Sequence, residues 1–523
     1  YALKYEKYPP HGGPAGLGRL TSQSLDEAVL LISAAMACDL IGDAPGVSRE
    51  DYGIIVKKLL IPAAKHVEGY NFGVHNIQIW HAVSALSAAA LAGNDGMAQR
   101  SIKSLSDQID KGITPDGFWY EMSSGYHLYA MKPLSVLAAI CKNKGVDLCS
   151  RPSFIKFFKV LPKMTLPDFS LPPINDYRHN VNLSEMTAGA ALAKYALNDP
   201  YFDGLTDALI ARSGDLNSFE RNFFIYHRSE ADKKGGGDLW KPPEESVHFP
   251  ASGVTVLRKA GKYALVKYHG FSGGHDHFDR PEIFYFDGRK ELFPDLGTVP
   301  YGHPLYQSWY RTTEAHNTMM VDGLQENRAA CTPTAFVNDR DYTGLTVDCT
   351  SLYEGVDIRR TVILMESGLV DIVSAKSEGS HTYDLFLHVN SPNDAALEFK
   401  GGEPIKGVSP NKEIAFYSKS EPGRGKSISF QSAGESSPSA VSNFMTSGRA
   451  DLYEGLSTGF HPDEKIPVVL LRAVGKTALF VTSTTSNNVN QNGDVKKDGY
   501  NVLIDLGNGR KLNIDSSVGL INK

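Results

Sequence analysis

The stretch SEADKKGGGDLWKPPEES, residues 229–246, divides the chain into two parts with different sequence patterns. Its consecutive glycines and its Pro-Pro pair indicate a linker or long loop, because both residue types interrupt regular structure. Segments rich in helix-forming residues precede it, and short runs of β-branched and aromatic residues follow it. We therefore predict a helical domain at residues 1–228, a linker at 229–246 and a β-domain at 247–523.

The N-terminal part alternates between helix-forming segments and short connections. Two Ala- and Leu-rich segments are followed by Gly42 and Gly93, which are suited to ending a helix. Short connections favour antiparallel helical hairpins, packed as layers or as a toroid. Helices are predicted at residues 25–41, 49–67, 74–92, 97–109, 125–141 with an interruption near Pro133, 152–161, 183–196, 202–211 and 217–225.

The C-terminal part has runs typical of strands, separated by turn signals such as Asp287-Gly288 and Asp322-Gly323. This pattern predicts an antiparallel β-sandwich. Residues 399–450 are rich in Ser, Gly and Lys and have little periodicity, so we expect long surface loops there. Strands are predicted at residues 253–258, 263–269, 282–286, 318–321, 360–365, 370–376, 383–389, 468–473 and 477–483.

The composition is that of an ordinary globular protein, with 41% hydrophobic and 21% charged residues among 523. The net charge of −6 argues against bulk nucleic-acid binding. No apolar run reaches membrane-spanning length, so no membrane partner is expected. The odd number of cysteines, 5, leaves at least one thiol unpaired within the chain. Cys141 and Cys149 are either joined or free and buried.

The stretch Ser272–Asp279 (SGGHDHFD) is the first candidate site. In a strand, His275 and His277 would point to one face, whereas a bend at the preceding Gly-Gly pair would let them diverge. His277, with Asp295 and His316 further along, gives a His/Asp/His set of the types that suit zinc. The alternative is that these are polar residues of a β-hairpin.

Residues 71–80 (NFGVHNIQIW) are the second candidate. His75, Asn76 and Gln78 lie at the start of an otherwise apolar helix, and Trp80 offers a flat surface of the kind on which sugar rings stack. The alternative is an N-cap cluster followed by a core tryptophan.

Residues 116–129 (DGFWYEMSSGYHLY) and 171–180 (LPPINDYRHN) are two further candidates. Tyr126 and Tyr129 are neighbours on one helix face, and Glu121 lies just before them. Their aromatic crowding is typical of a core, but the polar residues beside it indicate a cleft. Arg178 could form a bidentate hydrogen bond with a carboxylate, although its segment could also be a plain surface turn.

The segment Gly270–Gly274 (GFSGG) matches the G-x-S-x-G pattern of a nucleophilic serine. That chemistry requires a strand, a tight turn and a helix in succession. Here Gly-Gly-His-Asp-His and a β-type run follow instead of a helix. We therefore do not expect a serine hydrolase.

Six segments within residues 70–325 occur in an order that resembles the heparinase II/III-like polysaccharide lyases. This group includes the oligoalginate lyases and exolytic heparinases of polysaccharide lyase family fifteen. The resemblance implies an (α/α) toroid followed by an antiparallel β-sandwich. Fewer helices precede the His-Asn motif than in the family, and we find no small N-terminal β-domain, so the toroid is expected to be an incomplete barrel or to lack its N-terminal part. The segments are residues 74–80, 121–129, 172–176, 274–279, 294–298 and 315–318.

The resemblance implies β-elimination from a uronate, in which a carboxylate is neutralised, the C5 proton removed and the leaving O4 protonated. Tyr129 is implied as the acid, with the base role open between it and His75. His75, with Asn76 beside it, would contact and neutralise the carboxylate or act as the base, and His275 would close the site from the other side. A tyrosine base starts from a pKa of about 10, so it needs nearby positive charge, for which Arg178, His75 and His275 are candidates. The implied substrate-binding residues are Trp80, Gln78, Glu121, Tyr126 and Arg178.

The resemblance also implies a structural zinc on His277, Asp295 and His316 that fixes the loop bearing His275. We predict a secreted or periplasmic lyase that cleaves an alginate oligosaccharide, or heparin or heparan sulfate, exolytically. The chain begins at Tyr1 with no signal peptide in view, as in a processed or truncated product. The rivals are a non-catalytic glycan-binding protein and a hydrolase using Glu121 and Asp176.

Overall fold

The computed structural model forms two compact units, one helical and one β-rich. The helical unit comprises residues 1–120, 126–162 and 182–241, and the β-rich unit comprises residues 121–125, 163–181 and 242–523. Two short segments of the predicted helical domain, with Glu121 and Asp176, thus belong to the β-rich unit. The structure describes residues 2–42, 44–179, 181–212, 240–390, 403–421, 426–430, 440–447, 449–486, 495–498, 501–506, 510–517 and 519–520.

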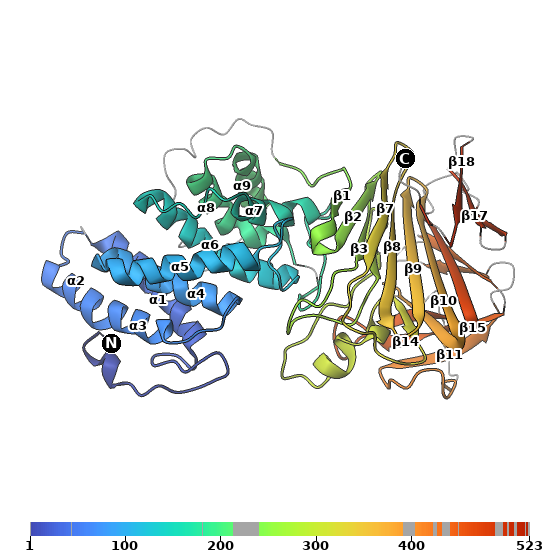
Figure 1. Ribbon diagram of the computed structural model, residues 1–523, viewed down its shortest axis with the longest axis horizontal. Coiled ribbons are helices and arrows are strands. Elements are labelled where there is room, and N and C mark those ends of the chain that lie inside the picture. The colour runs from blue at the N-terminus through green and yellow to red at the C-terminus, as the bar shows by residue number, and fades with distance from the viewer. Residues whose placement is uncertain are drawn as a thin grey trace. The chain divides into compact units, whose positions relative to one another are not determined.

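The helical unit is built around α4, which is almost entirely buried between neighbouring helices. Its run of Ala and Ser side chains allows α1, α3 and α5 to approach closely, as Figure 1 shows. Gly93 adopts a left-handed conformation with φ of 63° and ends α4, as predicted. The helices are α1 Ser24–Ile41, α2 Arg49–Ile55, α3 Ile61–Glu68, α4 Asn76–Ala92, α5 Asp95–Gly112, α6 Ser124–Lys144, α7 Pro152–Met164, α8 Thr187–Leu197 and α9 Tyr201–Arg212.

Two predicted helices differ from the structure, and both differences involve proline. The helix predicted at 49–67 contains a π-helical turn, Val56–Leu60, just before Pro62. Pro62 has no N–H to donate to the carbonyl of Lys58, which explains a local change of pitch. The helix predicted to be interrupted near Pro133 instead runs through it. No helix in the described ranges is long and apolar enough to cross a membrane. The helix predicted at 217–225 lies outside the described residues.

The β-rich unit contains antiparallel sheets, as predicted. One sheet has the strand order β1-β2-β3-β4-β5, and a larger one follows the order β11-β14-β15-β10-β9-β8-β7, with β6 beside β10 and β13 beside β15. Figure 1 shows β7, β8, β9 and β10 of the larger sheet side by side. A small sheet has the order β16-β17-β18. The strands are β1 Val247–Phe249, β2 Val254–Lys259, β3 Lys262–Lys267, β4 Glu282–Phe286, β5 Glu291–Phe293, β6 Met319–Val321, β7 Thr332–Asn338, β8 Tyr342–Tyr353, β9 Val356–Met365, β10 Gly368–His388, β11 Ile414–Ser420, β12 Lys426–Phe430, β13 Ala440–Thr446, β14 Ala450–Thr458, β15 Lys465–Ser486, β16 Val495–Asp498, β17 Asn501–Asp505 and β18 Lys511–Asp515.

The main core of this unit lies between the first two sheets. Val266 and Tyr285 of the smaller sheet join Val362, Leu385 and Phe480 of the larger one in a single buried cluster. The period-two alternation of apolar side chains directs one face of each strand into this layer. The arrangement is a β-sandwich, and the loops between β3 and β6 emerge from it.

One expectation about the β-rich unit is wrong. Residues 399–450, expected to be surface loops, include strands β11, β12 and β13 and the start of β14. Alternate side chains such as Ile414 and Phe416 are buried there, a periodicity that the Ser- and Lys-rich composition hides. The disulfide of this unit joins Cys331 to Cys349. Cys141 and Cys149 of the helical unit are free and buried, the second of the two predicted alternatives. The predicted linker at 229–246 lies largely outside the described residues.

Candidate functional site

Asp176 is the centre of the polar cluster in the β-rich unit. Its carboxylate lies 2.8 Å from His275 Nδ1, 3.1 Å from His277 Nε2, 2.7 Å from the Tyr306 hydroxyl and 3.3 Å from Thr298 Oγ1. Burial alone would raise the pKa of Asp176, but the hydrogen bonds from these side chains outweigh it and hold the pKa below its usual value. Asp176 is therefore an ionised acceptor that fixes the side chains around it.

His275 and His277 reach the two oxygens of this carboxylate from a loop and not from a strand. Residues 271–279 have no regular structure, and Gly273 has a φ of 105°, a conformation that favours glycine. The expectation of two histidines on one strand face is therefore wrong, and the predicted bend is what the structure contains. The bend lets both rings converge on Asp176.

His275 combines partial exposure with a fixed ring. Its side chain is 17% exposed, whereas those of His277 and Asp176 are buried. With its Nδ1–H bonded to Asp176, the neutral ring carries its lone pair on Nε2, which lies 3.7 Å from Glu121 Oε1. The Tyr301 hydroxyl is 3.1 Å from His275 Nδ1. The ring of His275 is thus held in one orientation by Asp176, with Nε2 directed towards Glu121.

His277 and His316 form the nitrogen side of a buried cluster that could hold a metal. His277 donates from Nε2 to Asp176, and His316 donates from Nε2 to the carbonyl of Tyr310 at 3.1 Å. The His277 ring therefore keeps its lone pair on Nδ1, the arrangement of a metal-binding histidine whose other nitrogen is fixed by an acceptor. The Nδ1 of His316 lies 3.1 Å from Glu282 Oε1. The buried Nδ1 of His277 has no hydrogen-bond partner among the described residues.

Buried carboxylates form the oxygen side of the same cluster. His277, Asp279 and His316 have donor atoms within 4.8 Å of one another, as do Asp279, Glu282, Asp295 and His316. Burial and the charge of Asp279 raise the pKa of Glu282 to about 8, and burial and Glu282 raise that of Asp295 to about 7. Too many acidic groups share one buried space to be ionised without a cation.

Lys267 supplies part of the positive charge that these carboxylates need. It is buried at the end of β3, contacts Asp279 and lies 2.5 Å from Asn175 Oδ1. Burial lowers its pKa, but the surrounding carboxylates outweigh this effect and raise it. One Asp279 oxygen has no hydrogen-bond partner among the described residues, so the cluster still offers an oxygen donor. The residues therefore fit a metal with nitrogen and oxygen ligands.

Of the predicted ligands, His316 belongs to both groups, whereas His277 and Asp295 belong to different ones. Asp279, which belongs to both groups, and Glu282 were not predicted as ligands. Asp279 was visible as a carboxylate two residues after His277, and Glu282 begins β4. The positions of the other missed residues, Tyr306 and Lys267, had no local sequence signal. Tyr306 comes from a π-helical turn, and Lys267 resembles an ordinary lysine at a strand end.

In the helical unit, His75 is the N-cap of α4. Its Nδ1 accepts a hydrogen bond from the backbone N–H of Ile77 at 3.2 Å, which places the proton of the neutral ring on Nε2. The Gln78 side chain accepts from Phe72 N–H at 3.0 Å and bonds Ser104 Oγ at 3.3 Å, and Asn76 is buried. The N-cap alternative therefore describes the local structure of this motif.

Trp80 and Tyr129 pack against each other, with ring centroids 5.2 Å apart. Trp80 is only 1% exposed, so its predicted role as a sugar-stacking surface is wrong and the core alternative is correct. Tyr126 lies with its ring centroid 6.3 Å from that of Tyr129, on the same side of α6 as predicted. Burial, followed by the charges of Asp26 and Tyr126, raises the pKa of Tyr129, opposite to the lowering that a base needs.

The remaining predicted residues belong to the β-rich unit. Glu121 is buried, and its carbonyl accepts a hydrogen bond from Ser272 Oγ at 3.1 Å. Ser272 also bonds Asp276, so it is a structural residue of the loop and not an activated nucleophile. Arg178 is exposed, two residues after Asp176.

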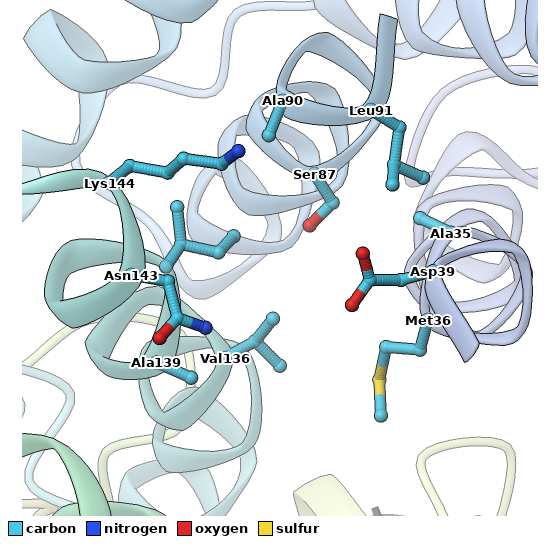
Figure 2. A pocket seen from close by; sticks show the side chains of 11 residues that line it. Ala35, Met36, Asp39, Ser87, Ala90, Leu91, Val136, Ala139, Asn143 and Lys144 are labelled. Carbon is cyan, nitrogen blue, oxygen red and sulfur yellow. The ribbon is translucent and has the colours of Figure 1, made fainter. Parts of the chain in front are cut away.

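A pocket of about 120 Å³ lies elsewhere in the helical unit, between α1, α4 and α6. Figure 2 shows the Asp39 carboxylate and the Ser87 hydroxyl pointing into it. Its first α6 residue, Val136, is 7 positions beyond Tyr129, about 10 Å along the helix axis. None of the candidate catalytic residues lines this pocket.

Comparison with known proteins gives matches in both parts of the chain. Residues 54–161 match the alginate lyase family model, and residues 241–455 match the heparinase II/III-like C-terminal model. An alginate lyase of Stenotrophomonas maltophilia (strain K279a) is 27% identical over 75% of this chain and 58% of that protein. An exo-oligoalginate lyase of Saccharophagus degradans is 24% identical over 71% of this chain and 56% of that protein. The chain spans less than two thirds of the length of these curated relatives.

Solved structures share the fold at low sequence identity. Heparinase III superposes with a TM-score of 0.70 at 13% identity, covering 98% of this chain and 77% of that one. The heparan sulfate lyase of Pedobacter heparinus gives a TM-score of 0.65 at 15% identity, covering 94% and 74%. These likenesses confirm the predicted fold class, helices of an (α/α) toroid followed by an antiparallel β-sandwich.

Proposed function

We propose, from the chain's resemblance to the heparinase II/III-like polysaccharide lyases, that it cleaves a uronate-containing acidic glycan by β-elimination. Both curated relatives are named as alginate lyases, which favours an alginate oligosaccharide as substrate, and the second is named as an exo-oligoalginate lyase, which favours exolytic cleavage. Heparan sulfate or another glycosaminoglycan is the second candidate, because a heparan sulfate lyase shares the fold. The observation that carries the proposal is the half-buried His275 held by the ionised Asp176.

The chemistry requires a proton acceptor for C5 and a proton donor for O4. His275 is suited to the first step, because Asp176 holds its ring in place with the lone pair on Nε2. Tyr129 is suited to the second, since burial raises its pKa and keeps the hydroxyl protonated. His75, with its proton on Nε2, and Asn76 would donate hydrogen bonds to the uronate carboxylate, which makes the C5 proton more acidic.

The metal cluster is proposed to hold a structural zinc on His277, Asp295 and His316, with Asp279 or Glu282 as a further oxygen ligand. Such a zinc would compensate the buried carboxylates and hold the segments on which the His275 loop rests. It would take no part in proton transfer. Elemental analysis of protein purified without added metal tests this proposal, and protein that contains no stoichiometric metal contradicts it.

We also propose that the protein is secreted or periplasmic. The Cys331–Cys349 disulfide supports this, because disulfides persist mainly in oxidising compartments. Titration of the denatured protein with a thiol reagent should detect the 3 free cysteines before reduction and 2 more after it. Detection of all the thiols in protein isolated from its native host under non-reducing conditions would remove this support.

The reaction itself is tested by the ultraviolet absorbance of the unsaturated uronate that only a lyase produces. We expect the absorbance to rise with oligoalginate, and the product pattern to show release of units from one end. A hydrolase would form reducing ends without the absorbance, and a binding protein would form neither. The hydrolase alternative requires Glu121 or Asp176 to be the protonated acid, and the lowered pKa of Asp176 argues against that role for Asp176.

A further inference from the structure

Arg328 is held between two aromatic rings of the loop that carries His275. Its guanidinium carbon lies 4.4 Å from the ring centroid of Phe271 and 4.9 Å from that of Phe278. All these residues belong to the β-rich unit. Cation–π contacts on two rings restrict the position of a long, flexible side chain. The guanidinium is thus fixed relative to the His275 loop although Arg328 is exposed.

The Arg328 guanidinium has no anionic partner of its own. Across the described residues it makes no ion pair or hydrogen bond, whereas Arg359 is paired with Asp348 at 2.6 Å and Arg472 with Asp384 at 2.6 Å. Its planar N–H groups match a carboxylate, which can accept two parallel hydrogen bonds. Holding such a group in place before binding reduces the entropy that an anion must overcome to use it.

The surroundings of Arg328 resemble a surface that binds a sugar next to the reacting one. Phe271 is 50% exposed and Tyr301 is 54% exposed, so part of each aromatic side chain is open to solvent. Phe271 is 4 residues from His275, and such a segment spans at most about 14 Å. The Tyr301 hydroxyl contacts His275 directly. The exposed aromatic side chains of Phe271 and Tyr301 and the unpaired guanidinium of Arg328 therefore lie near His275.

We propose that Arg328, with Phe271, forms a subsite that binds the carboxylate of a uronate unit adjacent to the one cleaved. The inference rests on the proposed lyase function and adds to it the residues that bind the neighbouring sugar. Every unit of a polyuronate carries a carboxylate, so a fixed guanidinium outside the reacting position would select uronate chains over neutral ones. Phe271 would position the guanidinium and offer its exposed edge to the sugar ring.

Steady-state kinetics with oligouronates of increasing length tests the subsite. Arg328→Gln is expected to raise KM by about tenfold or more, the effect of losing a hydrogen bond to a charged group, with kcat within about twofold. Arg328→Lys keeps the positive charge but loses the planar guanidinium that can donate two parallel hydrogen bonds, so its affinity should lie between those of the wild type and Arg328→Gln. Phe271→Leu should raise KM less than Arg328→Gln.

Arg340→Gln is the matched control, because Arg340 is also exposed and makes no ion pair or hydrogen bond within the described ranges. It should leave KM unchanged. An unchanged KM in Arg328→Gln, or a loss of kcat without a rise in KM, overturns the subsite. Melting curves of each variant distinguish a loss of affinity from a loss of folding.

Calorimetric binding separates failure of this inference from failure of the proposed function. Wild type that forms no unsaturated product from any uronate oligomer contradicts the lyase function, yet the subsite is still decided by affinity for a uronate trimer. Weaker binding by Arg328→Gln supports it, and equal binding contradicts it. A loss of affinity for a sulfated oligosaccharide alone would identify sulfate as the bound group and contradict the carboxylate assignment.

Discussion

The candidate residues of the helical unit and those of the β-rich unit are held in place by different forces. Tyr129 and His75 are positioned by helix backbone and by ring packing, and their neighbours are mostly uncharged. Asp176 and His277 are fixed by a buried network of ionisable groups that come from distant segments. In the helical unit, catalysis should therefore be separable from folding. In the β-rich unit, the same side chains should determine both.

The largest effect expected is the loss of activity in Tyr129→Phe. This change removes only the hydroxyl and keeps the ring against Trp80, so the melting temperature should change little. Losing general acid catalysis typically reduces the rate by a factor of about 100 to 10,000. The measurement is kcat on the best oligouronate, with melting curves on the same preparations.

Tyr126→Phe is the control for this experiment, because Tyr126 lies on the same helix face and loses the same atom. It should retain most of the activity. If Tyr126→Phe loses its activity while Tyr129→Phe keeps a kcat close to that of the wild type, the catalytic tyrosine of the pair is misassigned. Activity in both variants would exclude a tyrosine acid and leave His75 and His275 to be tested by alanine substitution.

His277→Ala should affect stability and metal content together. It removes a nitrogen ligand from the cluster and a hydrogen-bond donor from Asp176. Leaving buried charges without their partners costs about 3 kcal/mol or more of unfolding free energy. Zinc content by elemental analysis and thermal unfolding are the measurements. An unchanged melting temperature with no metal in the wild type would mean that the protein's own cations, Lys267 among them, balance the carboxylates.

Asp176→Asn should reduce activity by about 10- to 100-fold, the usual effect of changing a group that orients a ligand or base. An asparagine keeps the shape but places an N–H₂ where donors from His275, His277 and Tyr306 now converge, so at least one hydrogen bond must break. Activity and zinc content should be measured on the same sample. Full activity would show that His275 needs no carboxylate on Nδ1.

The same difference between the units explains what the sequence could predict. Helices and strands were predicted from local periodicity, and the errors occurred where a proline or a Ser-rich composition obscured it, as at Pro133 and Ile414. Motifs identified the metal-binding histidines because each lies in a short recognisable segment. The role of Asp176 could not be predicted, because the side chains that donate hydrogen bonds to it lie between 99 and 130 positions away in sequence.

Lys267 and Trp80 show the limits of reasoning from residue types. Nothing local to β3 indicates that Lys267 is buried among carboxylates, because the carboxylates around it come from three later segments. Trp80 follows a polar motif, as a sugar-binding tryptophan would, yet the helix turns its ring towards Tyr129 and away from solvent. Side-chain exposure depends on tertiary packing, which spacing along the chain does not contain.

The smallest effect expected concerns acid stability, and it tests whether charge is unimportant to the fold of the helical unit. His127 is buried; its Nδ1 accepts from Trp119 N–H at 3.1 Å, its Nε2 donates to the carbonyl of Phe157 at 2.9 Å, and its ring stacks on Phe157. Burial lowers the pKa of His127 to about 3. A proton added to Nδ1 would oppose the N–H of Trp119, which agrees with this direction.

Because the folded pKa lies below the unfolded value of about 6.5, the unfolded chain binds the proton first as the pH falls. The His127 contribution is therefore fully present above about pH 6.5 and decreases by about 1.4 kcal/mol per pH unit between there and the folded pKa. His127→Gln should be less stable at pH 7.5 but should lose stability less steeply between pH 6.5 and 4.5. His11→Gln, which changes an exposed histidine, should keep the wild-type slope. If His127→Gln keeps that slope too, the acid sensitivity arises from other buried groups, such as His388 in the β-rich unit, whose pKa burial also lowers to about 3.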